Sequence, residues 1–163
     1  MHILTGSGDA REFRVGIVLS TYHDFVTSRL RDGAVEALRN AGIDTETVVV
    51  VVVPGAFEIP QAACRLAASG RVDAVICLGC LIRGQTPHFD LIASAVAHGV
   101  TEAALDSGIP MTFGVLTTTS AEDALARAGA GSSNKGWEAA EAVLVMTRLF
   151  RELSPADPER SGG

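Results

Sequence analysis

The chain has 163 residues, 47% of them hydrophobic and 20% charged, and this length and balance predict one globular domain rather than a disordered chain. Its net charge of −6 argues against a general nucleic-acid-binding protein. No apolar stretch reaches the ~18 to 20 residues of a membrane span, and the polar residues 1–14 contain no signal-peptide core. Three cysteines, an odd number, argue against a disulfide framework. We therefore expect a reduced, cytoplasmic protein that binds neither nucleic acid nor membrane.

Apolar runs that predict buried strands alternate along the chain with helical patterns. In chain order they are a strand at 15–20, a helix at 24–41, strands at 48–53 and 74–82 separated by a helix at 58–69, a helix at 87–107, a strand at 112–117, and helices at 120–128 and 134–153. Near-continuous apolar strands are typical of parallel sheets covered on both faces. The order predicts a three-layer α/β/α sandwich with a central four-stranded parallel sheet, flavodoxin-like in type.

The ends of these elements carry their own signals. Gly42, Gly70 and Gly108 follow three of the helical patterns, where glycine commonly ends a helix. Ser120 and Asp123 have the spacing of a capping box. We expect a single domain over 14–153, with an N-terminal arm at 1–13 and a flexible C-terminal tail at 154–163.

Ligands of open parallel sheets bind beyond the carboxyl ends of the strands, so the loops there are the candidate sites. The loop after the third predicted strand reads GCLIRGQTPHFD over residues 79–90. Thr86 suits a helix N-cap and Pro87 the first helical position, so the N–H groups of 84–88 would surround one anion, such as phosphate. His88 lies beside this spot, where an imidazole can transfer protons, although a lone histidine can equally cap or pack.

The loop at 53–60 is the second candidate. Gly55 and Ala56 allow a planar ligand to approach closely, and Glu58 either caps the next helix or binds a polar substrate. Tyr22, after the first strand, and Phe113, within the fourth, could hold a heterocycle by stacking if they share a rim, but each alone is more typical of packing.

Basic residues flank the glycine-rich link at 128–134. Arg127 and Lys135 either interact with the ends of helices or, if the link folds against a site, bind phosphate. Residues 129–135 lack the GK[ST] ending and the preceding strand of a P-loop. Cys77 and Cys80 form a C-x-x-C inside a strand, where their side chains point to opposite faces, so packing is favoured over redox chemistry. No second cysteine pair or histidine cluster accompanies them, and no metal site is expected.

Five segments, in order along the chain, resemble the lumazine synthase family. They are VPGAFEIP at 53–60, GCLIRGQTPHFD at 79–90, FGVLTT at 113–118, RAG at 127–129 and NKG at 134–136. The resemblance covers about residues 14–153. It implies the condensation of 5-amino-6-(D-ribitylamino)uracil with 3,4-dihydroxy-2-butanone 4-phosphate to 6,7-dimethyl-8-ribityllumazine, phosphate and water, the penultimate step of riboflavin biosynthesis. It implies neither a metal nor a redox cofactor.

The resemblance also implies roles for single residues. His88 would transfer protons, and Arg127 would bind the phosphate with the backbone of Gln85 and Thr86. Phe113 and Lys135 would come from an adjacent subunit. The substrate would further contact Tyr22, Ala56, Phe57, Glu58, Cys80, Leu81 and Ile82. Two positions depart from the family pattern: Tyr22 stands where Phe or Trp is usual, and His23 replaces a usual Asn.

A shared site requires a homo-oligomer. The resemblance implies cyclic pentamers, which in many members of the family pack into an icosahedral shell, and riboflavin synthase is a candidate partner. Two alternatives stay open. A flavodoxin-like module that binds a flavin or lumazine without turnover would give His88 and Arg127 no joint role. A shell protein that has lost catalysis is disfavoured by the intact site residues.

Overall fold

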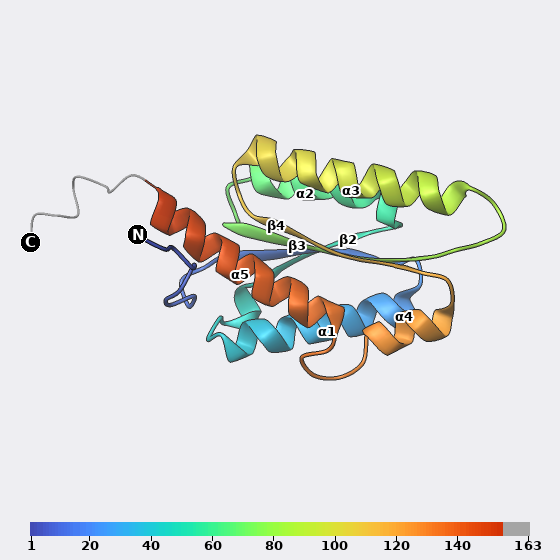
Figure 1. Cartoon of the computed structure of the whole chain (residues 1–163), viewed down its shortest axis with the longest axis horizontal. Coiled ribbons are helices and arrows are strands. Elements are labelled where there is room, and N and C mark those ends of the chain that lie inside the picture. The colour runs from blue at the N-terminus through green and yellow to red at the C-terminus, as the bar shows by residue number, and fades with distance from the viewer. Residues whose placement is uncertain (155–163) are drawn as a thin grey trace, which may run out of the picture.

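The computed structural model, which describes residues 1–154, is an α/β/α sandwich (Figure 1). Within those residues a four-stranded sheet in the order β2-β1-β3-β4 consists of β1 (Val15–Ser20), β2 (Val49–Val53), β3 (Ala74–Ile82) and β4 (Met111–Thr118). All three pairings are parallel, with Gly16 opposite Val49, Val15 opposite Ala74 and Val75 opposite Met111. The predicted fold class is thus confirmed, and β2 and β4 form the two edges of the sheet.

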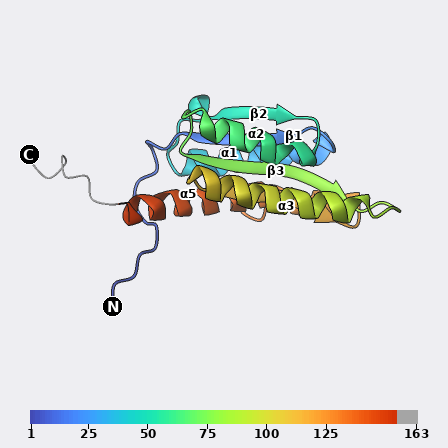
Figure 2. The ribbon, with the colours of Figure 1, turned by 90° about the horizontal axis from the view of Figure 1, so that it is seen from above.

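Helices cover both faces of this sheet. The described helices are α1 (Asp24–Asn40), α2 (Ile59–Ala68), α3 (His88–Ser107), α4 (Ala121–Arg127) and α5 (Lys135–Leu153). Helices α2 and α3 lie on one face, with α2 over β1 and β3 and α3 towards β4 (Figures 1 and 2). Helices α1, α4 and α5 lie on the other face. Two 3₁₀ turns, η1 (Thr45–Thr47) and η2 (Ala56–Glu58), were not predicted, because such short turns leave no periodic pattern.

Most of the predicted helix ends are confirmed. Gly42, Gly70 and Gly108 follow or end α1, α2 and α3 with positive φ angles of 87°, 68° and 70°. The Ser120 hydroxyl accepts a hydrogen bond of 3.1 Å from the backbone N–H of Asp123, as the capping spacing predicts. Thr86 is an exception.

Helix α3 begins one residue later than Thr86 would place it. Pro87 is its N-cap, His88 is its first residue, and no described side chain caps it. The carbonyl of Pro87 accepts the first hydrogen bonds of the helix, from Asp90 and Leu91. The predicted capping role of Thr86 is therefore wrong, because its hydroxyl is one residue too early in the chain.

The sheet separates two apolar cores. Cys77 is fully buried in the core beneath α2 and α3, and Cys80 in the core beneath α1 and α5, so the two side chains point to opposite faces as predicted. Burial raises the pKa of the Cys77 thiol to about 12 and that of Cys80 to about 11. Both thiols are protonated at neutral pH, which excludes thiolate chemistry by this pair.

Strand β2 differs from the prediction of full burial. Its side chains alternate, and Val50 and Val52 are 42% and 59% exposed. The reason is its place at the edge of the sheet, where no described helix covers the face that carries Val50 and Val52. A run of valines does not reveal strand order, so the sequence could not predict this exposure.

The two ends of the chain complete the fold. Ala10 and Phe13, from the segment predicted as an arm, are buried in the core with α1 and α5, and Arg151 stacks on the Phe13 ring. The predicted tail at 154–163 lies, apart from Ser154, outside the described residues. Among the helices of residues 1–154, none is both long and apolar enough to cross a membrane.

Candidate active site

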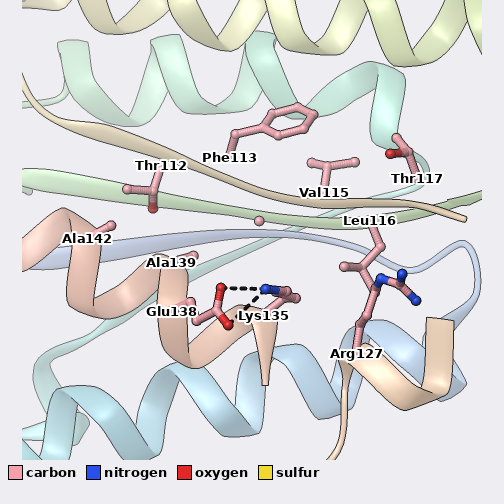
Figure 3. A pocket seen from close by; sticks show the side chains of 11 residues that line it. Thr112, Phe113, Val115, Leu116, Thr117, Arg127, Lys135, Glu138, Ala139 and Ala142 are labelled. Carbon is pink, nitrogen blue, oxygen red and sulfur yellow. Dashed lines mark hydrogen bonds and ion pairs between the residues drawn. The ribbon is translucent and has the colours of Figure 1, made fainter. Parts of the chain in front are cut away.

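An open groove of about 420 Å³ runs along the outer edge of β4 (Figure 3). Phe113 lines it from β4, with its ring on the side of the strand away from the two cations, whereas Arg127 comes from the last turn of α4 and Lys135 from the first turn of α5. These three candidates lie on three different elements, yet they line one cavity. The groove exists because β4 has no strand on its outer side, so the end of α4 and the first turns of α5 line its open edge.

Both cations in this groove have carboxylates close by. The Nζ of Lys135 donates to both carboxylate oxygens of Glu138, at 2.9 and 2.7 Å (Figure 3). Arg127 donates one hydrogen bond of 3.0 Å to the backbone carbonyl of Asp123, and its guanidinium lies 3.9 Å from that carboxylate. The Arg127 side chain is half exposed. Sequence reasoning missed Glu138, although its spacing of three residues from Lys135 on a helix indicates such a pair.

The loop between β3 and α3 forms a second part of the candidate site. Gln85, Thr86 and His88 are all exposed. Leu81 and Ile82, at the end of β3, are half-buried, whereas the Cys80 side chain is buried.

A side-chain clasp closes that loop. The Arg83 guanidinium donates two hydrogen bonds of 2.9 and 2.7 Å to the Asp90 carboxylate and stacks 4.4 Å from the centre of the Phe89 ring. This pairing holds the pKa of Asp90 below its ordinary value, and its first cause is the hydrogen bond from Arg83. The backbone N–H of Arg83 also donates to Thr118 at the end of β4. The clasp fixes both ends of the segment that contains Gln85 and Thr86, and sequence reasoning missed it.

The loops after β1 and β2 lie side by side at the same edge of the sheet. The backbone N–H of Tyr22 donates to the carbonyl of Pro54 at 3.1 Å, which links the two loops directly. Tyr22 and Phe57 present rings that are 65% and 51% exposed, whereas Ala56 is buried. A Cβ at Gly55 would come within 3.0 Å of the Glu58 carboxylate, so glycine leaves room for that side chain at the start of α2.

His23 has an unusual backbone conformation. Among the described residues it is the one non-glycine residue with positive φ, at φ 60° and ψ 48°. Its ring makes edge-on contacts with Tyr22 and Phe25, at centroid distances of 4.6 and 5.8 Å. Burial lowers the pKa of His23. Asparagine tolerates this left-handed conformation better than histidine does, which explains why Asn at this position suits the fold.

One chain does not bring all the candidates together. Strand β3 lies between β1 and β4, and Phe113 is the third residue of β4, opposite Cys77. Two strand spacings, about 10 Å, therefore separate Phe113 sideways from the end of β1 that leads to Tyr22. Arg127 lies in the β4 groove with Phe113 and Lys135, not with Gln85 and Thr86. The candidates form two sets, one at the carboxyl ends of β1, β2 and β3 and one along the edge of β4.

Comparison with known proteins assigns this arrangement to a family. The family described as 6,7-dimethyl-8-ribityllumazine synthase matches residues 12–151, a range that includes both sets of candidates. The chain is also similar to the 6,7-dimethyl-8-ribityllumazine synthase of Syntrophus aciditrophicus (strain SB), with 47% identity over 144 residues, 88% of this chain and 94% of that one. Residues 1–154 contain no group of three or more His, Cys, Asp or Glu side chains placed to hold a metal ion. The chain belongs to the 6,7-dimethyl-8-ribityllumazine synthase family.

Proposed function

We propose that this chain is a transferase that condenses 5-amino-6-(D-ribitylamino)uracil with 3,4-dihydroxy-2-butanone 4-phosphate. The products are 6,7-dimethyl-8-ribityllumazine, phosphate and water, in the penultimate step of riboflavin biosynthesis. The observation that carries the proposal is the family match over residues 12–151, which spans every candidate residue. The alternative, a module that binds a flavin without turnover, has no such observation in its favour.

The active site in this proposal lies between two subunits. Each set of candidates is open by itself, with the rings of Tyr22, Phe57 and Phe113 between 44% and 65% exposed. Such a concentration of exposed apolar rings is typical of surfaces that another molecule covers. In our proposal the β4 groove of one subunit faces the strand ends of its neighbour, and a ring of five subunits repeats this contact, with an icosahedral shell as the larger assembly.

The chemistry requires positioning, proton transfer and an anion site. The aromatic amine attacks the ketone, and a first water leaves as the Schiff base forms. Phosphate then leaves by elimination, and the ribitylamino nitrogen closes the second ring with loss of another water. His88, exposed at the start of α3, would accept and return the protons that these steps move. The protein supplies no covalent nucleophile in this scheme, so holding the two substrates together contributes much of the rate.

Phosphate recognition falls mainly to Arg127. Its guanidinium is half exposed and donates one hydrogen bond within the chain, whereas the Lys135 charge is offset by the two short hydrogen bonds to Glu138. A guanidinium can also bind phosphate through two parallel hydrogen bonds, which an ammonium cannot do. Backbone N–H groups of Gln85 and Thr86, from the neighbouring subunit, would complete the anion site.

The test is the direct assay of lumazine formation. The purified chain is mixed with both substrates, and product is followed by its absorbance and fluorescence, with and without EDTA. We expect product formation at the same rate in both conditions. Tight flavin binding without any product from the two substrates would support the non-catalytic alternative instead.

A further inference from the structure

The side chain of Asn134 is buried at the start of α5, next to the groove that holds Arg127 and Lys135. It is 2% exposed, and its Oδ1 accepts hydrogen bonds from the backbone N–H groups of Gly136, at 2.7 Å, and Trp137, at 3.3 Å. These two bonds are an ordinary helix cap. A cap alone would be satisfied by any small polar side chain at this position.

The other half of the Asn134 amide performs a different task. Its Nδ2 donates to the carbonyl of Gly129 at 2.8 Å and to the carbonyl of Arg29, in α1, at 3.0 Å. Gly129 lies two residues after Arg127, and Asn134 immediately precedes Lys135. One buried amide thus connects both ends of the glycine-rich link and attaches them to α1.

Helix α1 is shaped to receive this amide. A Cβ at Gly33 would overlap the Asn134 side chain, so α1 carries a glycine at the point of contact. Glycine in a helix interior is less favourable than alanine. Its presence in the middle of α1 is explained by the room that Asn134 needs.

We propose that Asn134 is the positioning residue of the phosphate site, because it fixes Arg127 and Lys135 relative to each other across the link at 128–134. The inference rests on the proposed function, in which Arg127 binds the phosphate and Lys135 lines the same groove. The link contains Gly129 and Gly131 and two exposed serines, so without the amide it is free to adopt many conformations. Arg127 and Lys135 would then both still be present, but their positions relative to each other would no longer be fixed.

The variant that isolates this role is Asn134→Ser. Serine is as good a helix cap as asparagine and is uncharged, but it is too short to reach both carbonyls. We expect the KM for 3,4-dihydroxy-2-butanone 4-phosphate to rise about 10-fold, whereas the KM for the uracil substrate changes little. Inorganic phosphate should raise the melting temperature of the wild-type chain, and this rise should shrink in the variant.

Two further variants separate positioning from stability. Val143→Ala, at a buried position further along α5, lowers the melting temperature without touching the link, and should keep both the KM and the phosphate-dependent rise. Gly33→Ala crowds the amide from the other side and should reproduce the effects of Asn134→Ser, even though alanine favours a helix. It also provides the test if Asn134→Ser does not fold.

The outcomes distinguish this inference from the function on which it rests. A wild-type chain that makes lumazine and is protected by phosphate, with Asn134→Ser and Gly33→Ala unchanged in KM and in protection, overturns the role of Asn134 alone. Equal rises in the KM of both substrates also overturn it, because they indicate a general loss of structure. A wild-type chain that makes no lumazine overturns the proposed function.

Discussion

Gly136 packs directly against the backbone carbonyl of Leu30, so that a Cβ at residue 136 would overlap that oxygen. This contact holds the start of α5 against the middle of α1. It thereby fixes the position of Lys135, which lines the groove along β4. Because the obstacle is backbone rather than a flexible side chain, neither helix can yield without moving the other. The glycine of the NKG segment therefore has a packing role.

Gly136→Ala should destabilise the chain by about 3 kcal/mol or more, as overpacking against a rigid backbone does. The measurement is urea or thermal unfolding followed by circular dichroism. Gly129→Ala is the control, since its added Cβ would meet only a carbonyl at 3.8 Å, an ordinary contact distance. Equal stability of the two variants would contradict the packing role of Gly136.

His88→Ala should lower kcat and leave the fold intact. General acid–base residues contribute ~10²–10⁴-fold, and we expect the low end or less here, since bringing the substrates together supplies much of the rate. His98→Ala, at an exposed position on the same helix, is the matched control and should keep full activity. Steady-state kinetics of lumazine formation compare the two. An unchanged rate of His88→Ala across neutral pH would remove His88 from the mechanism.

Arg127→Ala should raise the KM for the butanone phosphate about 10²-fold and affect the uracil substrate far less, because charge-assisted hydrogen bonds to phosphate are lost. Arg127→Lys should recover only part of this loss, since an ammonium cannot form the paired contact. Arg39→Ala, an exposed arginine at the end of α1, removes the same charge elsewhere and should change neither KM. A parallel loss of affinity for both substrates in Arg127→Ala would mean that Arg127 acts through structure.

The helices and strands of this fold could be predicted from the sequence wherever a local sequence signal determines their position. β1 and β3 lie where their apolar runs predict, and three helices stop at their glycines. Thr86 shows the limit of such signals. Thr86 and Pro87 both suit the start of α3, and the backbone hydrogen bonds to the Pro87 carbonyl show that Pro87 is the N-cap. Strand order has no local sequence signal. Val50 is exposed because that order places β2 at the edge of the sheet.

The same limit applies to the candidate site. The sequence could not show that Arg127 lines a groove with Phe113, since that depends on β4 being an edge strand. The clasp of Arg83 on Asp90 and the pairing of Lys135 with Glu138 were also missed. Both are short-range pairs across a loop or one helical turn, which a search for charge spacing can find.

His23→Asn should stabilise the chain, by about 1 kcal/mol or less, because asparagine adopts the left-handed conformation more readily. The gain should also depend on pH. Burial lowers the pKa of His23 in the folded state, so below about pH 6.5 the unfolded chain binds more protons and stability falls as the pH drops towards the lowered pKa. Above that range His23 is neutral in both the folded and the unfolded state, so it does not make the free energy of unfolding depend on pH.

The test of this prediction is the urea midpoint of His23→Asn and of the original chain, measured at about pH 7.5 and again at about pH 5.5. The difference between the two proteins should be larger at the lower pH. His98→Asn, on an exposed helical position, should bring no gain at either pH. A difference that stays constant between the two pH values would show that His23 does not titrate with unfolding.

The division of the candidates into two sets predicts the outcome of mixing inactive subunits. His88 lies with the strand-end set, whereas Phe113, Arg127 and Lys135 line the β4 groove. If a site forms between subunits, one chain needs an intact His88 and its neighbour an intact groove. Subunits with His88→Ala, mixed with subunits that carry Phe113→Ala and Lys135→Ala, should regain activity at some interfaces. Arg127→Ala subunits should behave in the same way, because Arg127 belongs to the groove set.

The matched control is a mixture of two variants damaged in the same set, Arg127→Ala with Lys135→Ala. No interface in that mixture unites an intact groove with an intact His88 from the neighbour, so activity should stay at the level of the separate variants. The subunits are unfolded and refolded together, and light scattering confirms that hybrid oligomers form. Recovery in the His88→Ala mixtures but not in the control supports a site shared between subunits. A monomer that keeps full activity at high dilution would contradict the shared site altogether, because one chain leaves its two sets of residues apart.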